Sequence, residues 1–134
     1  MLWLAKDRHK FFNPNPTKRT DIGDCVLRTF CRATGKDWDT VFKELCEIAF
    51  ELKALPNSDV TWKAYMERSG EFREHKLIIK KGSKRPTPTT FSKAHKEGTF
   101  ILSLAGHLVC VQDGFFWDTW DCGDKAVYKY WEKV

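Results

Sequence analysis

The chain between residues 24 and 70 repeats apolar side chains at the three- and four-residue spacing of helices that bury one face. The first repeat begins after Asp24, which we expect to be an N-cap, and ends at Gly35, a residue that commonly terminates helices. This predicted helix therefore places Cys25 in its first turn.

The second predicted helix carries the longest apolar stripe in the chain. Either Asp37 or Asp39 suits its N-cap, and Pro56 ends it. A third helix is predicted over about 60–68. The stripe that we expect the second helix to bury consists of Trp38, Val41, Phe42, Leu45, Ile48, Ala49 and Leu52.

Beyond residue 75 the pattern changes to short runs of β-branched and aromatic residues, which favour strands. A basic loop over 80–86 and a short helix over 87–96 interrupt these runs. Asp113 and Gly114 form a strong hairpin-turn signal. The predicted strands cover 75–80, 99–104, 107–112, 115–118 and 126–131.

The order of these elements predicts an α+β fold in which N-terminal helices pack on a C-terminal antiparallel β-sheet. A length of 134 residues fits a single domain. Within it we expect an irregular leader over 1–20, a helical part over 24–70 and a mostly antiparallel sheet over 75–134. The leader contains Pro14 and Pro16, which exclude a helix there.

Composition narrows the class of protein. Hydrophobic residues make up 42% and aromatic residues 14%, which excludes disordered and fibrous chains. Apolar runs such as 100–102 are far shorter than the roughly 20 residues of a membrane span. The charged segment 6–10 follows the apolar start, the reverse of the order in a signal peptide. We therefore expect a cytoplasmic protein without a membrane partner, whose five cysteines are mostly reduced.

The net charge of +5 is too small to indicate nucleic acid by itself. Basic residues beside aromatic ones over 6–12 and 72–85 leave nucleic-acid binding open as an alternative. The interspersed acids Asp7, Glu71 and Glu74 favour ordinary solvated segments there.

Cys25 is the first candidate for chemistry. A thiol at a helix N-terminus feels the positive end of the helix dipole and free N–H groups, and both favour the nucleophilic thiolate. The alternative is a small buried residue. That alternative fits Cys31, Cys46 and Cys110, which lie on predicted apolar faces, whereas Cys122 lies in a predicted loop that could expose it.

His107 and Asp118 are the next candidates, because the turn at 113–114 makes their strands neighbours. Counted outward from that turn, the two residues fall near each other without lying directly opposite. A carboxylate there could orient an imidazole that acts as a base. The alternatives are a surface histidine at a strand end and an aspartate that caps a turn.

Cysteine, histidine and aspartate in this order are the parts of a thiol nucleophile with its base and orienting acid. From about residue 21 to 120 the chain resembles the papain-like cysteine peptidase superfamily. It looks closest to the small C39-like and NlpC-type peptidases and to phage and bacterial proteins of the same layout. The resemblance rests on the segments 23–30, 34–38, 98–102, 106–111, 113–114 and 118–120.

The resemblance implies a hydrolase that cleaves a peptide, isopeptide or related amide bond in a peptide or protein substrate, without a cofactor. In that family Cys25 would be the nucleophile, His107 the general base and acid, and Asp118 the orienting group. An acyl-enzyme on the thiol would be the intermediate.

The resemblance also implies an oxyanion hole made of the Cys25 backbone N–H and an upstream polar side chain. Papain-like enzymes use a glutamine there, but this chain has none before the cysteine. Thr20, Asp21 and Asn15 are the substitutes that the sequence offers, although an ionised Asp21 would repel an oxyanion.

The missing glutamine leads to a second expectation, a catalytically idle papain-like domain that binds a protein or nucleic-acid partner. Such a domain suits a phage or bacterial accessory factor, with a host or viral protein as partner and the host cytoplasm as its location if the chain is phage-encoded. We predict no metal site. His107 and Cys110 have a ligand-like spacing, but strand alternation directs them to opposite faces.

Overall fold

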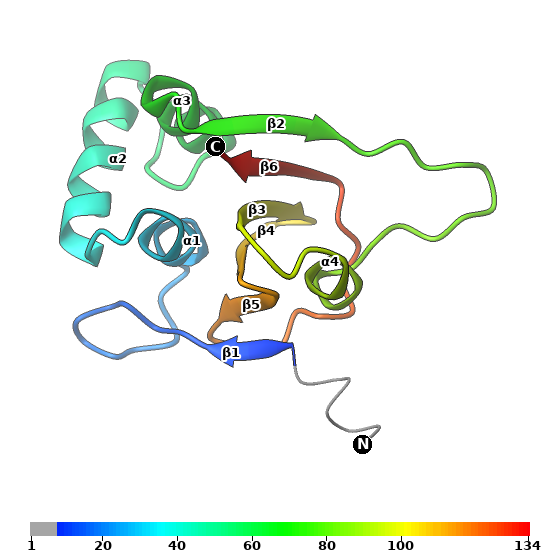
Figure 1. The fold of residues 1–134 in the computed structure, drawn as a ribbon. Helices are drawn as coiled ribbons and strands as arrows, with labels where there is room; N and C mark the ends of the chain where they lie inside the picture. Colours follow the sequence, from blue (N-terminus) through cyan, green and yellow to red (C-terminus); the bar gives the residue numbers. More distant parts are fainter. Residues whose placement is uncertain (1–7) are drawn as a thin grey trace.

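The computed structural model describes residues 8–134 and contains four helices and six strands (Figure 1). This confirms the predicted α+β class. The helices are α1 (Cys25–Thr34), α2 (Trp38–Leu52), α3 (Asp59–Ser69) and α4 (Pro88–Ala94). The strands are β1 (His9–Phe11), β2 (Phe72–Lys76), β3 (Thr99–Leu104), β4 (His107–Gln112), β5 (Phe115–Asp118) and β6 (Lys129–Lys133).

The six strands of residues 8–134 form one sheet in the order β1-β5-β4-β3-β6-β2. β1 pairs with β5 in parallel, and the other pairs are antiparallel. The leader, which we expected to be irregular, therefore supplies a strand, and this edge of the sheet is parallel rather than antiparallel. β1 is joined to β5 by backbone bonds across about a hundred residues of chain, such as Phe116 N–H to the Arg8 carbonyl, and a local pattern carries no signal for such pairing.

The end of α1 and the start of α2 follow the predicted capping signals. Gly35 ends α1 with a φ of 76°, a left-handed conformation that glycine adopts without strain. Of the two candidate caps for α2, Asp37 is the one used, because its side chain accepts from the Thr40 N–H. No helix in residues 8–134 is long and apolar enough to cross a lipid bilayer.

The buried face of α2 is narrower than the predicted stripe. Val41 and Leu45 are fully buried, but Phe42 and Leu52 are 39% and 37% exposed. α2 contacts α1 and α3 on its inner side alone, so the outer members of a wide apolar stripe stay in contact with water. The stripe predicted the helix correctly and overestimated its burial.

Two strands begin or end elsewhere than predicted. β2 covers Phe72–Lys76 rather than 75–80, and its pairing with β6 ends where Lys76 meets Lys129. Beyond that point the apolar run has no partner strand, and Ile78 is 91% exposed. β6 correspondingly lies over Lys129–Lys133 rather than 126–131.

The sheet lies between α1–α3 on one side and α4 on the other (Figure 1). Because strand side chains alternate, β4 contributes to both layers. Leu108 and Cys110 pack with Phe30 of α1, whereas Val109 and Val111 pack with Phe91 of α4. This arrangement brings the first turn of α1 over the beginning of β4.

Candidate active site

Cys25 is the first residue of α1, directly after Asp24. Asp24 occupies the predicted cap position, but its side chain makes no capping hydrogen bond. Its carboxylate instead accepts from Arg28 at 2.5 Å, Trp38 at 3.0 Å and Asn15 at 3.3 Å. Asp24 is thus the N-cap residue as predicted, but it lacks the side-chain hydrogen bond that such a residue usually makes. The first N–H groups of α1 are left uncapped by Asp24, and the positive end of the helix dipole acts on the thiol.

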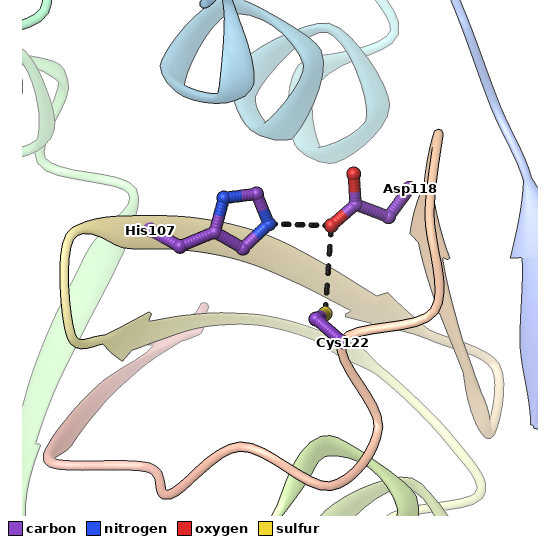
Figure 2. A group of neighbouring side chains, drawn as sticks. All are labelled: His107, Asp118 and Cys122. Atoms are coloured by element: carbon purple, nitrogen blue, oxygen red, sulfur yellow. Dashed lines mark hydrogen bonds and ion pairs between the residues drawn. The ribbon is translucent and has the colours of Figure 1, made fainter.

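His107 begins β4, and its Nε2 lies 2.5 Å from Oδ2 of Asp118, the last residue of β5 (Figure 2). The β4–β5 register pairs Cys110 with Trp117. One pair further along, Asp118 falls opposite Val109. Val109 lies two residues from His107, and residues two apart in a strand share a face. The hairpin therefore brings together the two residues at the offset that the sequence indicates.

Cys25 and His107 line the same cavity, which has a volume of about 570 Å³. Burial raises the pKa of the Cys25 thiol. Interactions with the His107 ring and with the Leu108 backbone, together with the charges of His107 and Arg28, outweigh burial and bring the pKa of Cys25 below its ordinary value. A lowered pKa increases the fraction of nucleophilic thiolate at neutral pH.

The pKa values of His107 and Asp118 move apart. Burial lowers the pKa of His107, but hydrogen bonds with Asp118, Cys122 and Cys25 and the charge of Asp118 raise it to about 11. Burial raises the pKa of Asp118, and the bond and charge of His107, with the charge of Arg28, bring it below its usual range. Both shifts favour a protonated ring and an ionised carboxylate at neutral pH.

Arg28 is a member of the site that sequence reasoning missed. Its side chain is buried, and it donates from Nη1 to Asp24 at 2.5 Å and from Nη2 to Oδ1 of Asp118 at 3.1 Å. The spacing of Asp24 and Arg28 on a helix is a signal for an ion pair. It does not reveal that the pair is buried or that it reaches a carboxylate ninety residues away.

Cys122 is the second missed member. We expected a loop that could expose it, whereas its side chain is fully buried and its thiol lies 3.4 Å from Oδ2 of Asp118 (Figure 2). The Thr119 N–H donates to the other oxygen of Asp118 at 2.7 Å. Both oxygens of Asp118 thus accept from two partners each, Arg28 and Thr119 on one and His107 and Cys122 on the other. The carboxylate is held in one orientation.

His107, Asp118 and Cys122 offer ligand-type atoms within 4.8 Å of one another. Neighbouring ligands of a tetrahedral zinc ion with bonds of about 2.0–2.1 Å lie roughly 3.3 Å apart. The 2.5 Å separation of the His107 and Asp118 atoms is too short for both to bind one ion. Arg28 adds a positive charge to this group, so these three residues fit a hydrogen-bonded triad better than a metal centre.

The candidates for a second oxyanion donor lie in different places. Thr20 and Asp21 line the cavity beside Cys25. The carboxylate of Asp21 accepts two hydrogen bonds from Arg19, at 2.9 and 2.8 Å. Asn15 is buried and bound to Asp24, and it does not line the cavity.

No protein-family model, no curated protein and no solved structure matches this chain in comparisons with known proteins. The candidate site is therefore described by its own geometry.

Proposed function

We propose that this chain is a cysteine hydrolase of papain-like type that cleaves a peptide, isopeptide or related amide bond. Cys25 is the nucleophile and His107 is the general acid and base. Asp118 orients the His107 ring and stabilises its protonated form. One observation carries the proposal: a thiol at a helix N-terminus and a histidine line the same cavity, and a buried carboxylate holds that histidine.

Each group suits one part of acyl transfer. The positive end of α1 and the imidazolium favour thiolate at Cys25. Because Nε2 of His107 is bound to Asp118, Nδ1 is the ring nitrogen left for the thiol and the leaving group. The ionised Asp118 fixes the ring and stabilises its charged form, the role of the acid in nucleophile–histidine–acid triads.

The reaction would proceed in two stages. The Cys25 thiolate adds to the substrate carbonyl carbon, and the His107 imidazolium gives its proton to the leaving nitrogen as the C–N bond breaks. A thioester remains on Cys25. Neutral His107 then takes a proton from water, whose oxygen attacks the thioester and releases the acid. The cavity between α1 and β4 would hold the substrate chain.

Backbone N–H groups in the first turn of α1, beginning with that of Cys25, are the main source of oxyanion stabilisation in this proposal. Thr20 is the one hydroxyl among the upstream candidates that lines the cavity. Asp21 is an unsuitable donor, since its carboxylate accepts from Arg19.

The first test is the selectivity of thiol alkylation. In the folded protein we expect iodoacetamide to modify Cys25 well ahead of the other cysteines at neutral pH. Cys46 is the matched control because it is a partly buried free thiol like Cys25. Burial raises the pKa of Cys31 and Cys110 to about 12 and of Cys122 to about 11. Equal labelling of Cys25 and Cys46 in peptide maps would count against the proposal.

Turnover is the second test. A fluorogenic peptide library should yield a cleaved substrate with wild-type protein and none with Cys25→Ala, while Cys46→Ala retains the activity.

The lack of an upstream glutamine favours a second candidate, the idle domain of the same type that binds a protein partner. Selective alkylation of Cys25 without turnover of any library member supports that candidate over the hydrolase.

A further inference from the structure

Basic and aromatic side chains alternate on one face of the sheet where β1 and β5 pair. The parallel register sets Lys10 beside Trp117 and His9 beside Phe116, so Arg8 falls beside Phe115. Residues at every second position share a face. Arg32 of α1 adds to this surface, which we call the basic-aromatic face and define as Arg8, Lys10, Phe12, Arg32, Phe115 and Trp117.

Aromatic rings hold the three cations of this face in place. The Arg32 guanidinium carbon lies 3.4 Å from the centroid of the Trp117 ring, and Lys10 Nζ lies 4.7 Å from that of Phe115. The Arg8 guanidinium lies 5.6 Å from the Phe115 centroid. Such contacts fix the position of a cation, but a ring has no net charge and leaves the positive charge unneutralised.

The other polar contacts of these cations are also neutral. Arg8 donates to the Gly114 carbonyl at 3.3 Å, and Arg32 donates to the Gln112 side chain at 2.8 Å. None of the ion pairs among residues 8–134 involves Arg8, Lys10 or Arg32. The face therefore combines partly exposed aromatic rings with three positive charges, none of which forms an ion pair with another described residue.

We propose that the basic-aromatic face binds single-stranded nucleic acid. Three positioned cations suit a run of phosphates, and aromatic rings or guanidinium planes are surfaces on which unpaired bases stack. The outer side of the Arg32 guanidinium, backed by Trp117, would be one such platform. A single strand fits better than a duplex because stacked base pairs do not expose their flat faces.

This surface is separate from the candidate active site. Phe115 and Trp117 alternate along β5 with Asp118, so they face the opposite side of the strand. None of the six residues of the face lines the cavity of Cys25 and His107. Binding at this face is thus independent of the proposed hydrolase activity.

Fluorescence anisotropy with labelled oligothymidylate and oligouridylate of about 20 nucleotides tests the proposal, with a duplex of equal length for comparison. Three phosphate contacts on a single strand give a slope of log K against log salt of about −2, or an 18-fold loss between about 50 and 200 mM salt. Tighter binding of either single strand than of the duplex, with this slope, supports the proposal.

The variant Lys10→Gln/Arg32→Gln should reduce the slope to about −0.7 and weaken binding at low salt at least tenfold. If the double variant fails to fold, Lys10→Gln alone takes its place, since Lys10 lies on the edge strand β1. This single variant should reduce the slope by about a third. Lys63→Gln is the matched control, since Lys63 also lies over an aromatic ring, that of Trp62 5.5 Å away.

Three results would overturn the proposal. They are an absence of single-strand binding at low salt, binding of the duplex as tight as that of the single strands, and an equal loss of affinity in Lys63→Gln. Cys25→Ala should bind like wild type, and Lys10→Gln should keep the selective alkylation of Cys25. A failure of either proposal is therefore visible separately from the other.

Discussion

Nη2 of Arg28 lies 3.1 Å from Oδ1 of Asp118, and both side chains are buried. Asp118 therefore divides its negative charge between this guanidinium and the imidazole of His107. The charge of Arg28 lowers the pKa of Asp118 and also that of the Cys25 thiol. Arg28 is thus a positioning residue in the proposed site that fixes the carboxylate and favours thiolate.

Replacement of Arg28 by methionine should destabilise the fold by about 3–5 kcal/mol, because it leaves the buried carboxylate of Asp24 without a cation and removes one of the two cations that Asp118 contacts. Urea unfolding followed by tryptophan fluorescence measures the change. The matched control is Arg19→Met, which breaks the solvent-exposed pair with Asp21 and should leave the unfolding free energy unchanged within error. An equal loss of unfolding free energy in both variants would show that the buried ion pairs of Arg28 stabilise the fold no more than the exposed pair of Arg19.

Replacement of His107 by glutamine should raise the pKa of Cys25 toward its ordinary value, since the ring supplies both a hydrogen bond and a positive charge. The pH at which alkylation of Cys25 reaches half its maximal rate should move upward. The rate at pH 7 should fall, because a smaller fraction of the Cys25 thiol is then ionised. His75→Gln, a partly exposed histidine of β2, is the control, and its profile should match wild type.

Replacement of Asp118 by asparagine should lower the pKa of His107, because both the hydrogen bond and the charge of the carboxylate raise it. The ring would then lose its proton at a lower pH, and the alkaline limb of any pH–activity profile should move to lower pH. NMR titration of the His107 ring gives the pKa directly. Asp113→Asn, in the exposed turn between β4 and β5, should leave that pKa where it is in the wild type.

The unfolding free energy should fall both at alkaline pH, through His107, and at acid pH, through Asp118. Folding raises the pKa of His107 to about 11, so the protonated ring stabilises the fold fully below its unfolded pKa of about 6.5, and this contribution is lost as the pH rises toward 11. Folding lowers the pKa of Asp118, so its contribution is present above about pH 3.9 and is lost as the pH falls.

The lowered pKa of Cys25 opposes the alkaline loss, because its thiolate stabilises the fold increasingly as the pH rises. Cys25→Ser should therefore show a steeper decline of the unfolding free energy than wild type as the pH rises toward the ordinary thiol pKa of about 8.5. Urea titrations at a series of pH values measure both curves. Identical alkaline slopes in the two proteins would contradict the interaction of the thiolate with the His107 ring.

Local pattern determined much of the architecture. Repeats of apolar residues located α1, α2 and α3, and Gly35 ended α1 as expected. The turn at 113–114 joined β4 to β5 and brought His107 and Asp118 together. These features depend on residues within one helix or hairpin, where spacing along the chain translates directly into position in space.

Other features depend on which distant segments meet. The leader residues 9–11 became the parallel partner of β5, and the apolar run 77–79 stayed outside the sheet because β6 offers it no partner there. Arg28 and Cys122 joined the site because α1 packs over β4 and the loop after β5 folds inward. Neither contact has a periodic signal in the sequence.

The α+β class, the helix that begins with Cys25 and the hairpin that carries His107 and Asp118 thus follow from local patterns along the chain. The packing of the folded chain places α1 over that hairpin, buries Arg28 between two carboxylates and gathers cations over Phe115 and Trp117. The physical reason is that hydrogen bonding and periodic burial act over a few residues, whereas packing joins surfaces without regard to their separation along the chain.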